Sequence, residues 1–242
     1  QFQYFGIWLF LSFILQGLFS FLLVERATKR VEIAVIGTLF FLCSPFLFQR
    51  LAAHMALSAH WIVLASLFFF FLRSSMRMQM LWIALLVISL LVHPYLMCMA
   101  AAVYAAWILK IVFVTKEVSM PKGILLFLFS IGLIVAVGYS IGLFSIGSMS
   151  TETYGNYGAN GNSLFNPLGW SEALSDRPVV LYQQEGFAYL GLGMLVMLFL
   201  SIALLLFDRK QIQEIMRSFW PLLLAVFACT LLAVTHNVYA GD

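Results

Sequence analysis

The sequence predicts an all-α membrane protein with many spans, and three observations support this. First, 63% of the 242 residues are hydrophobic and 10% are charged, with a mean hydropathy of +1.01. A soluble domain has roughly 45–50% apolar and about 25% charged residues, so lipid must cover most of this surface. Second, apolar runs recur at about the 20-residue length that crosses a bilayer. Third, charged residues concentrate in the short loops between these runs. We expect about eight membrane helices in one transmembrane domain, residues 1–242.

The predicted membrane helices follow one another along the whole chain. In order they are residues 4–24, 31–43 or beyond, 57–72, 79–92, 95–114, 123–145, 187–207 and 218–235. Two of them are short and stop at a proline, before Ser44-Pro45 and before His93-Pro94. Proline removes a backbone donor and disfavours helical geometry in the preceding residue. We therefore expect two helix breaks at membrane depth that form the floor of a cavity open to the outer face, since such backbone needs cover by protein or water.

The basic residues predict the orientation of the chain. Eleven of the 13 Lys and Arg residues lie in or beside four short loops, at residues 25–30, 73–79, 115–122 and 208–217, and the other two are Arg50 and Arg177. The positive-inside rule places such loops in the cytoplasm. Residue 1 and the long loop 146–186 then lie on the extracytoplasmic side. The chain begins without an initiator Met, and we expect it to be part of a longer protein.

The loop at residues 146–186 differs in composition from the rest of the chain. It is rich in glycine, asparagine and aromatic residues. Long connections of this kind are usually functional or disordered, and the aromatic content argues against disorder. We expect a folded cap over the outer mouth of the protein. Of its acidic residues, Glu185 lies where the chain re-enters the membrane, which makes it the candidate catalytic base.

The polar residues of the outer side form the candidate binding site. All four histidines, His54, His60, His93 and His236, fall on that side together with Arg50. Ionisable groups at membrane depth are costly and favour a functional explanation. The alternative is a set of interfacial histidines whose polar edges face water.

The spacing of this cluster suggests an anion site. On one helix continuing from Pro45, Arg50, His54, Ser58 and Trp61 would share a narrow stripe. An arginine fork beside imidazole and hydroxyl donors suits a phosphate or pyrophosphate. No local metal-ligand spacing is present, so we predict no metal site, although zinc could bind if distant segments converged. The cysteines Cys43, Cys98 and Cys229 are expected to be apolar packing residues.

Several segments together resemble a known family. They are RLAAHMALSAHW (50–61), HPYL (93–96), LFNPLGWS (164–171), EGFAYLGLG (185–193) and THNVYAGD (235–242). The chain resembles an uncharacterised bacterial family of multi-pass inner-membrane proteins that is similar to GT-C glycosyltransferases, which take sugars from polyprenyl-phosphate donors on the outer side.

The resemblance implies a donor-binding site for a polyprenyl-phosphate sugar. Arg50 and His54 match the polar pair before the third span, His93 and Tyr95 the HPY break, and Trp170 and Glu185 the outer loop. GT-C enzymes place their main catalytic acid on an earlier outer loop, so the main base is expected outside this chain. The acceptor stays open, as does the use of a divalent metal, and no nucleic-acid partner is expected.

Two other functions remain open at the level of the sequence. A transporter or flippase for a lipid-linked glycan would also use proline-broken helices at membrane depth. A non-catalytic assembly subunit would use the aromatic outer loop as a docking surface. Because the polar residues cluster on one side rather than through the whole membrane, the sequence favours the enzyme.

Overall fold

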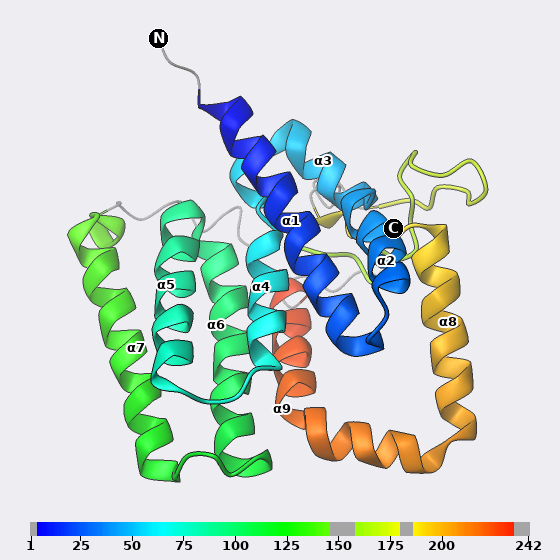
Figure 1. Ribbon diagram of the computed structural model, residues 1–242. Coiled ribbons are helices and arrows are strands. Elements are labelled where there is room, and N and C mark those ends of the chain that lie inside the picture. Colours follow the sequence, from blue (N-terminus) through cyan, green and yellow to red (C-terminus); the bar gives the residue numbers. More distant parts are fainter. Residues whose placement is uncertain (1–3, 146–157, 180–185, 235–242) are drawn as a thin grey trace.

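A computed structural model describes residues 4–145, 158–179 and 186–234, and every regular element within these ranges is helical (Figure 1). In chain order the elements are α1 (Phe5–Thr28), α2 (Val31–Leu42), α3 (Pro45–Ala53), η1 (Met55–Ser58), α4 (Trp61–Phe70), α5 (Met76–Val92), α6 (Pro94–Leu109), η2 (Lys110–Val114), α7 (Met120–Ser140), η3 (Leu143–Ser145), α8 (Leu192–Phe207) and α9 (Arg209–Val234). The predicted all-α class is therefore confirmed.

Fewer helices can cross a membrane than the sequence suggests. Four described helices are long and apolar enough: Phe5–Thr28, Pro94–Val114, Met120–Ser140 and Arg209–Val234. The bent pair Val31–Leu42 and Pro45–Leu51, which turns by 44°, adds a fifth if it forms one span. The prediction of about eight membrane helices is wrong, because α4, α5 and α8 have only 10, 17 and 16 residues. At about 1.5 Å per residue, helices of 10 and 16 residues reach ~15 and ~24 Å, short of a hydrocarbon core of ~30 Å.

The proline breaks predicted from the sequence are present. Ser44 is extended and Pro45 is the first residue of α3. His93 is extended between α5 and α6, and its Nδ1 accepts a hydrogen bond from the backbone N–H of Tyr95 at 3.2 Å. The break at His93 is thus an N-cap in which an imidazole satisfies a free donor of the new helix.

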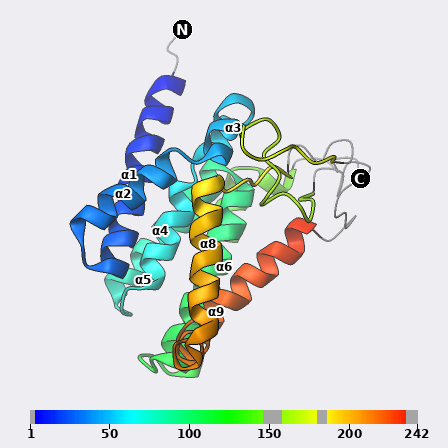
Figure 2. The ribbon, with the colours of Figure 1, turned by 90° about the vertical axis from the view of Figure 1, so that its right-hand side faces the viewer.

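One predicted loop is helical. Residues 208–217 were expected to connect two spans, but α9 begins at Arg209 and runs to Val234 with Pro221 inside it. Figure 1 shows the first part of α9 lying across the lower edge of the molecule, and the later part turning upward. In Figure 2 this later part crosses the bundle obliquely. A helix with proline inside it bends readily, and Pro221 fits the change of direction in α9.

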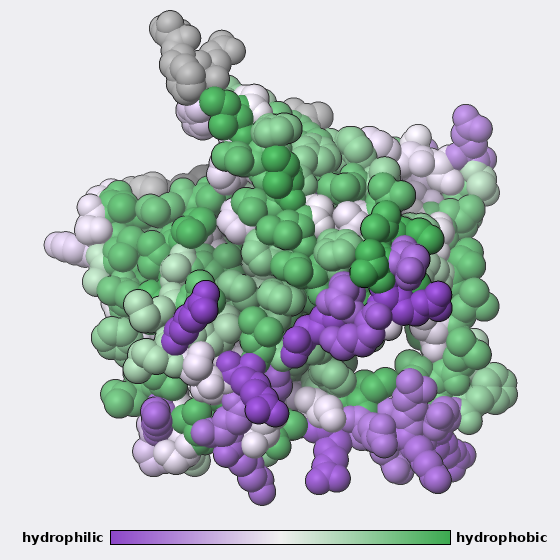
Figure 3. Space-filling model, viewed as in Figure 1, coloured by the Kyte–Doolittle hydropathy of each residue, from purple (hydrophilic) through white to green (hydrophobic). Residues whose placement is uncertain are grey.

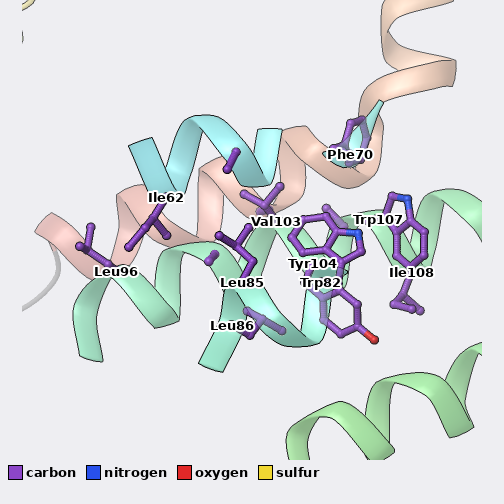
Figure 4. Close-up of a cluster of buried hydrophobic side chains, with 14 of the residues drawn as sticks. Ile62, Phe70, Trp82, Leu85, Leu86, Leu96, Val103, Tyr104, Trp107 and Ile108 are labelled. Atoms are coloured by element: carbon purple, nitrogen blue, oxygen red, sulfur yellow. The ribbon is translucent and has the colours of Figure 1, made fainter. Parts of the chain in front are cut away.

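The main core lies between α4, α5 and α6. Its large rings are Trp82, Tyr104 and Trp107 (Figure 4), with Trp82 centred 5.3 Å from Tyr104 and 5.9 Å from Trp107. Tyr104 also belongs to a buried polar group with Gln79 and Ser130: Gln79 Nε2 donates to Tyr104 Oη at 2.7 Å and to Ser130 Oγ at 2.9 Å. These bonds join α5, α6 and α7 where water cannot compete.

Side chains from other helices cap the C-terminal end of α4. The carbonyl oxygens of Phe70–Leu72 accept, in order, from Lys110 Nζ at 2.6 Å, Arg26 Nη2 at 2.8 Å and Trp107 Nε1 at 3.2 Å. A helix end leaves its last carbonyls without intrahelical partners, and cations there also oppose the helix dipole. Arg26 and Lys110, which were counted as loop charges, therefore also hold α1, α4 and α6 together.

The hydrophilic surface concentrates at one end of the molecule. Figure 3 shows purple residues along the lower part of the view, where the α1–α2 turn and the start of α9 lie, and green apolar surface above. The loop between α4 and α5 and the turn before α7 reach the same lower end (Figure 1). The four basic loops therefore share one face, and α3 and the described loop 158–179 lie at the opposite end.

Candidate functional site

Helix α3 is the element that positions the candidate site. The predicted stripe of Arg50, His54, Ser58 and Trp61 on one helix is wrong, since α3 ends at Ala53 and the chain passes through η1 before α4 begins. The indole N–H of Trp8, on α1, donates to the carbonyl oxygen of Met55 at 3.2 Å. This tertiary bond contacts the segment that separates α3 from α4. The predicted site residues are therefore brought together by the tertiary fold and not by their spacing on one helix.

Arg50 and His60 lie close together where α3 ends and α4 begins. His60 is the residue before α4, and its ring packs on Phe46 of α3, with centroids 4.9 Å apart. Burial first, and then the positive charge of Arg50, lower the pKa of His60 from 6.5 to about 4. His60 Nδ1 is buried and has no hydrogen-bond partner within the described part of the chain. The imidazole is thus neutral at pH 7 and carries a free polar edge beside a guanidinium.

The second pair is His54 and His93. His54 follows α3 and is exposed. Burial and then the charge of His54 lower the pKa of His93. The ring of Tyr95 lies over His93, with centroids 5.1 Å apart, and 70% of Tyr95 is exposed. The structure therefore brings the HPY break to the end of α3, as a binding site shared by these segments requires.

Trp170 connects the outer loop to the same helix. Its ring stacks on Phe48 of α3, with centroids 6.5 Å apart, and also faces Phe187 at 6.4 Å. Phe187 and Tyr189 form a second apolar cluster with Leu195, against which Phe46 packs. Residues 187–191 form no helix, so the predicted span 187–207 begins later, at Leu192. These rings fix α3 between the outer loop and α4.

The described part of the outer loop is held by a buried asparagine. Asn166 is 1% exposed. Its Nδ2 donates to the carbonyl oxygen of Arg177 at 2.8 Å, and its Oδ1 accepts from the backbone N–H of Arg177 at 3.0 Å. Asp176 Oδ1 accepts from the N–H of Gly169 at 2.8 Å. Residues 166–177 therefore form a closed loop that places Trp170 against α3.

A stripe of polar residues on α1 was missed by the sequence reasoning. Ser12, Gln16 and Ser20 are the buried residues of α1, although its apolar side chains are largely exposed. Ser12 Oγ and Gln16 Oε1 have no hydrogen-bond partner among the described residues, and both side chains border, with Ser58, a gap too small for a water molecule. Their four-residue spacing in an apolar run was the signal that could have found them, since it places them on one helix face.

Glu185 and His236 lie outside the described residues. Within the described part, no group of three or more His, Cys, Asp or Glu residues could hold a metal ion. A cavity of about 530 Å³ lies between the outer loop and α8, and neither Pro45 nor Pro94 lines it. The cavity therefore differs in position from the one expected above the proline breaks.

The arrangement offers one cation, three exposed or half-buried imidazoles and aromatic walls at one end of apolar helices. A guanidinium with neighbouring imidazoles can bind an oxyanion such as a phosphate, and exposed tryptophan and tyrosine rings suit the faces of a sugar or a lipid.

No curated protein and no solved structure matches the chain. The family model described as a domain of unknown function, DUF6311, matches residues 1–242, and the chain belongs to that family.

Proposed function

We propose that this protein is a membrane glycosyltransferase that binds a polyprenyl-phosphate-linked sugar at the α3 end and transfers the sugar there. The observation that carries the proposal is the meeting of Arg50 with His60, and of His54 with His93, at the end of the molecule opposite the basic loops. Separate segments supply these residues, so their meeting is a property of the fold.

The chemistry of the donor explains the residue types. The departing polyprenyl phosphate develops negative charge, and preorganised cations in a place with little water stabilise that charge well. Arg50 is half-buried, which strengthens its attraction for a phosphate relative to bulk water. His60 stays neutral and can donate or accept one hydrogen bond without adding charge. Glu185 remains the candidate base for the acceptor hydroxyl within this chain.

The proposed orientation in the membrane rests on the difference in charge between the two ends of the molecule. Lys and Arg residues concentrate in cytoplasmic loops of membrane proteins, and here the basic loops lie on the face opposite α3. The α3 end is then extracytoplasmic, in a bacterial inner membrane, where polyprenyl-linked sugars present their head groups. The acceptor is a molecule that reaches this outer face.

A flippase for the same lipid-linked sugar is the second candidate. The observation in its favour is the buried stripe Ser12, Gln16 and Ser20, which carries polar atoms along α1 away from the α3 end. However, Ser20 Oγ donates to the carbonyl oxygen of Gln16 at 2.7 Å within its own helix. Small residues bonded in this way commonly serve close helix packing, so the stripe alone supports transport less strongly than the cation cluster supports phosphate binding.

The test is the affinity of the purified full chain for a short-chain polyprenyl phosphate in detergent micelles. Arg50→Gln and His54→Asn are each expected to weaken binding tenfold or more, which corresponds to about 1.4 kcal/mol. Arg77→Gln, an exposed arginine at the opposite end, is the matched control and should bind normally. Equal binding by wild type, Arg50→Gln and His54→Asn would overturn the phosphate site.

A second measurement separates the two candidate functions. Sugar transfer from the polyprenyl phosphate to added glycan acceptors is expected in wild-type proteoliposomes and is expected to be lost in Arg50→Gln. If the sugar instead crosses the bilayer still attached to its lipid, the flippase is correct. If the phosphate binds and neither activity occurs, the protein is an assembly subunit and the transferase proposal fails.

A further inference from the structure

A cavity of about 530 Å³ lies between the loop 158–179 and α8, and its lining includes none of the residues Arg50, His54, His60 and His93 that form the α3 cluster. Its volume falls within the ~300–1,000 Å³ typical of small-molecule sites. The loop contributes one wall and α8 the other. The lining residues are Phe165, Ala173, Leu174, Ser175, Asp176, Arg177, Leu192, Leu195, Val196 and Phe199.

The α8 wall is apolar and continues along the helix. Leu192, Val196 and Phe199 are spaced by four and three residues, so they share one helix face. Phe165 of the loop stacks on Phe199, with centroids 6.1 Å apart. Beyond Phe199 the exposed side chains of α8 are apolar to Phe207 except Ser201, whose hydroxyl donates to the carbonyl oxygen of Met197 at 2.7 Å. A hydrocarbon chain that leaves the cavity along α8 therefore stays on apolar surface.

The loop wall carries two opposite charges at adjacent positions. Asp176 Oδ1 is engaged by the N–H of Gly169, which leaves Oδ2 without a hydrogen bond to any described residue. The backbone of Arg177 is held on both sides by Asn166, while its guanidinium makes no ion pair or hydrogen bond with the described part of the chain. Among the described residues, Asp176 Oδ2 and the Arg177 guanidinium therefore have no partner, while Asp176 Oδ1 and the backbone of Arg177 are held.

We propose that this cavity binds a zwitterionic phospholipid of the bilayer, with its phosphate on Arg177, its ammonium group on Asp176 and one acyl chain on α8. Paired opposite charges at the mouth of an apolar groove match such a head group. The carboxylate of Asp176 would repel an anionic head group, and the guanidinium of Arg177 would repel a cationic amphiphile. The site lies at the end of α8 away from the basic loops (Figure 1). It shares no residue with the α3 cluster, so it does not depend on the proposed function.

The experiment uses the purified full chain in detergent micelles with trace phosphatidylethanolamine that carries a diazirine on its acyl chain. After illumination, mass spectrometry of peptides is expected to locate the label on residues 192–199 and on the facing loop residues. A tenfold excess of unlabelled phosphatidylethanolamine should remove most of this label, and the same excess of phosphatidylglycerol should leave most of it.

Three variants test the contacts separately. Asp176→Asn keeps an oxygen for the Gly169 N–H but loses the charge, Arg177→Gln loses the cation, and Val196→Trp fills the groove. Each is expected to reduce labelling at this site at least fivefold. Glu172→Gln, an exposed acid of the same loop, and Leu204→Trp, 72% exposed on the same helix, are the controls and should label as wild type.

Two outcomes would overturn the proposal. Labelling by a diazirine phosphatidylglycerol equal to that by phosphatidylethanolamine would remove the zwitterionic assignment. Unchanged labelling in Asp176→Asn and Arg177→Gln, with thermal unfolding curves like that of wild type, would remove both charged residues from the site. The same unfolding curves show that any loss of labelling in Val196→Trp comes from the filled groove in a folded protein.

Discussion

At the scale of single residues, His60 shows how the fold changes a group that the sequence already singled out. The sequence placed His60 beside Arg50 and His54 on the outer side, and the structure agrees that these residues gather at one end. The sequence could not show that the His60 ring packs on Phe46, because that contact depends on the turn η1 between α3 and α4. Burial and the Arg50 charge together lower its pKa to about 4.

This lowered pKa predicts how stability depends on pH. The unfolded chain has a histidine pKa of about 6.5, so between pH 6.5 and 4 the unfolded state binds more protons than the folded state. Stability is therefore complete above about pH 6.5 and falls as the pH is lowered through this window. Comparing pH 7 with pH 4.5, we expect His60 to account for a loss on the order of 2 kcal/mol in the free energy of unfolding.

The measurement is unfolding by SDS titration in mixed micelles at both pH values. His60→Gln should lose this part of the pH dependence, while His54→Gln, at an exposed position, should keep it. If His60→Gln and wild type lose the same free energy between pH 7 and 4.5, the imidazole is not the buried neutral group described here.

At the scale of elements, the sequence predicted helix ends well where proline marks them and poorly elsewhere. Ser44-Pro45 and His93-Pro94 end helices as expected, since proline acts through local geometry. The sequence predicts too early a start for α8, because Phe187 and Tyr189 are apolar yet not helical. Their packing with Phe46 and Leu195 is a tertiary contact that the sequence does not reveal. An apolar composition indicates that a segment is buried in lipid or protein, but it does not indicate where a helix begins.

Glycines on α7 give an element-scale prediction with an internal control. A Cβ added at Gly123 would lie 2.5 Å from Val112 Cγ2 of η2, whereas one added at Gly132 meets nothing within 4 Å. Valine is stiff at χ1 and cannot move aside easily. Gly123→Ala should therefore separate α7 from η2 and lower the free energy of unfolding by about 1–3 kcal/mol, the usual cost of overpacking.

Gly132→Ala should be neutral or stabilising by up to about 1 kcal/mol, since alanine favours the helix. Both variants can be compared with wild type in the same SDS titration. If the two alanines have equal effects, the close approach of α7 to η2 does not limit stability. The comparison separates a packing role for Gly123 from the general preference of helices for alanine.

At the scale of the whole molecule, the separation of the basic loops from α3 could be predicted from the sequence, whereas the predicted number of spans was wrong. Counting basic residues needs only their order along the chain, and the loops that carry most of them lie at one end of the fold (Figure 1). Counting spans needs helix lengths, which were overestimated for α4, α5 and α8. Four or five described helices are long enough to cross the membrane, and their number alone does not say which end of the molecule is cytoplasmic. The uneven distribution of basic residues is therefore the stronger argument for the orientation.

The positive-inside rule then predicts which end is cytoplasmic. In a variant without its own cysteines, Glu172→Cys at the loop end should react with a membrane-impermeant maleimide on intact bacterial spheroplasts. Arg77→Cys at the basic end should react only after the membrane is permeabilised. Both positions are exposed, so a difference in labelling reports the side of the membrane and not burial. The reverse pattern would place the α3 cluster in the cytoplasm, where an extracytoplasmic sugar donor could not reach it, and would reject the proposed transferase together with the orientation.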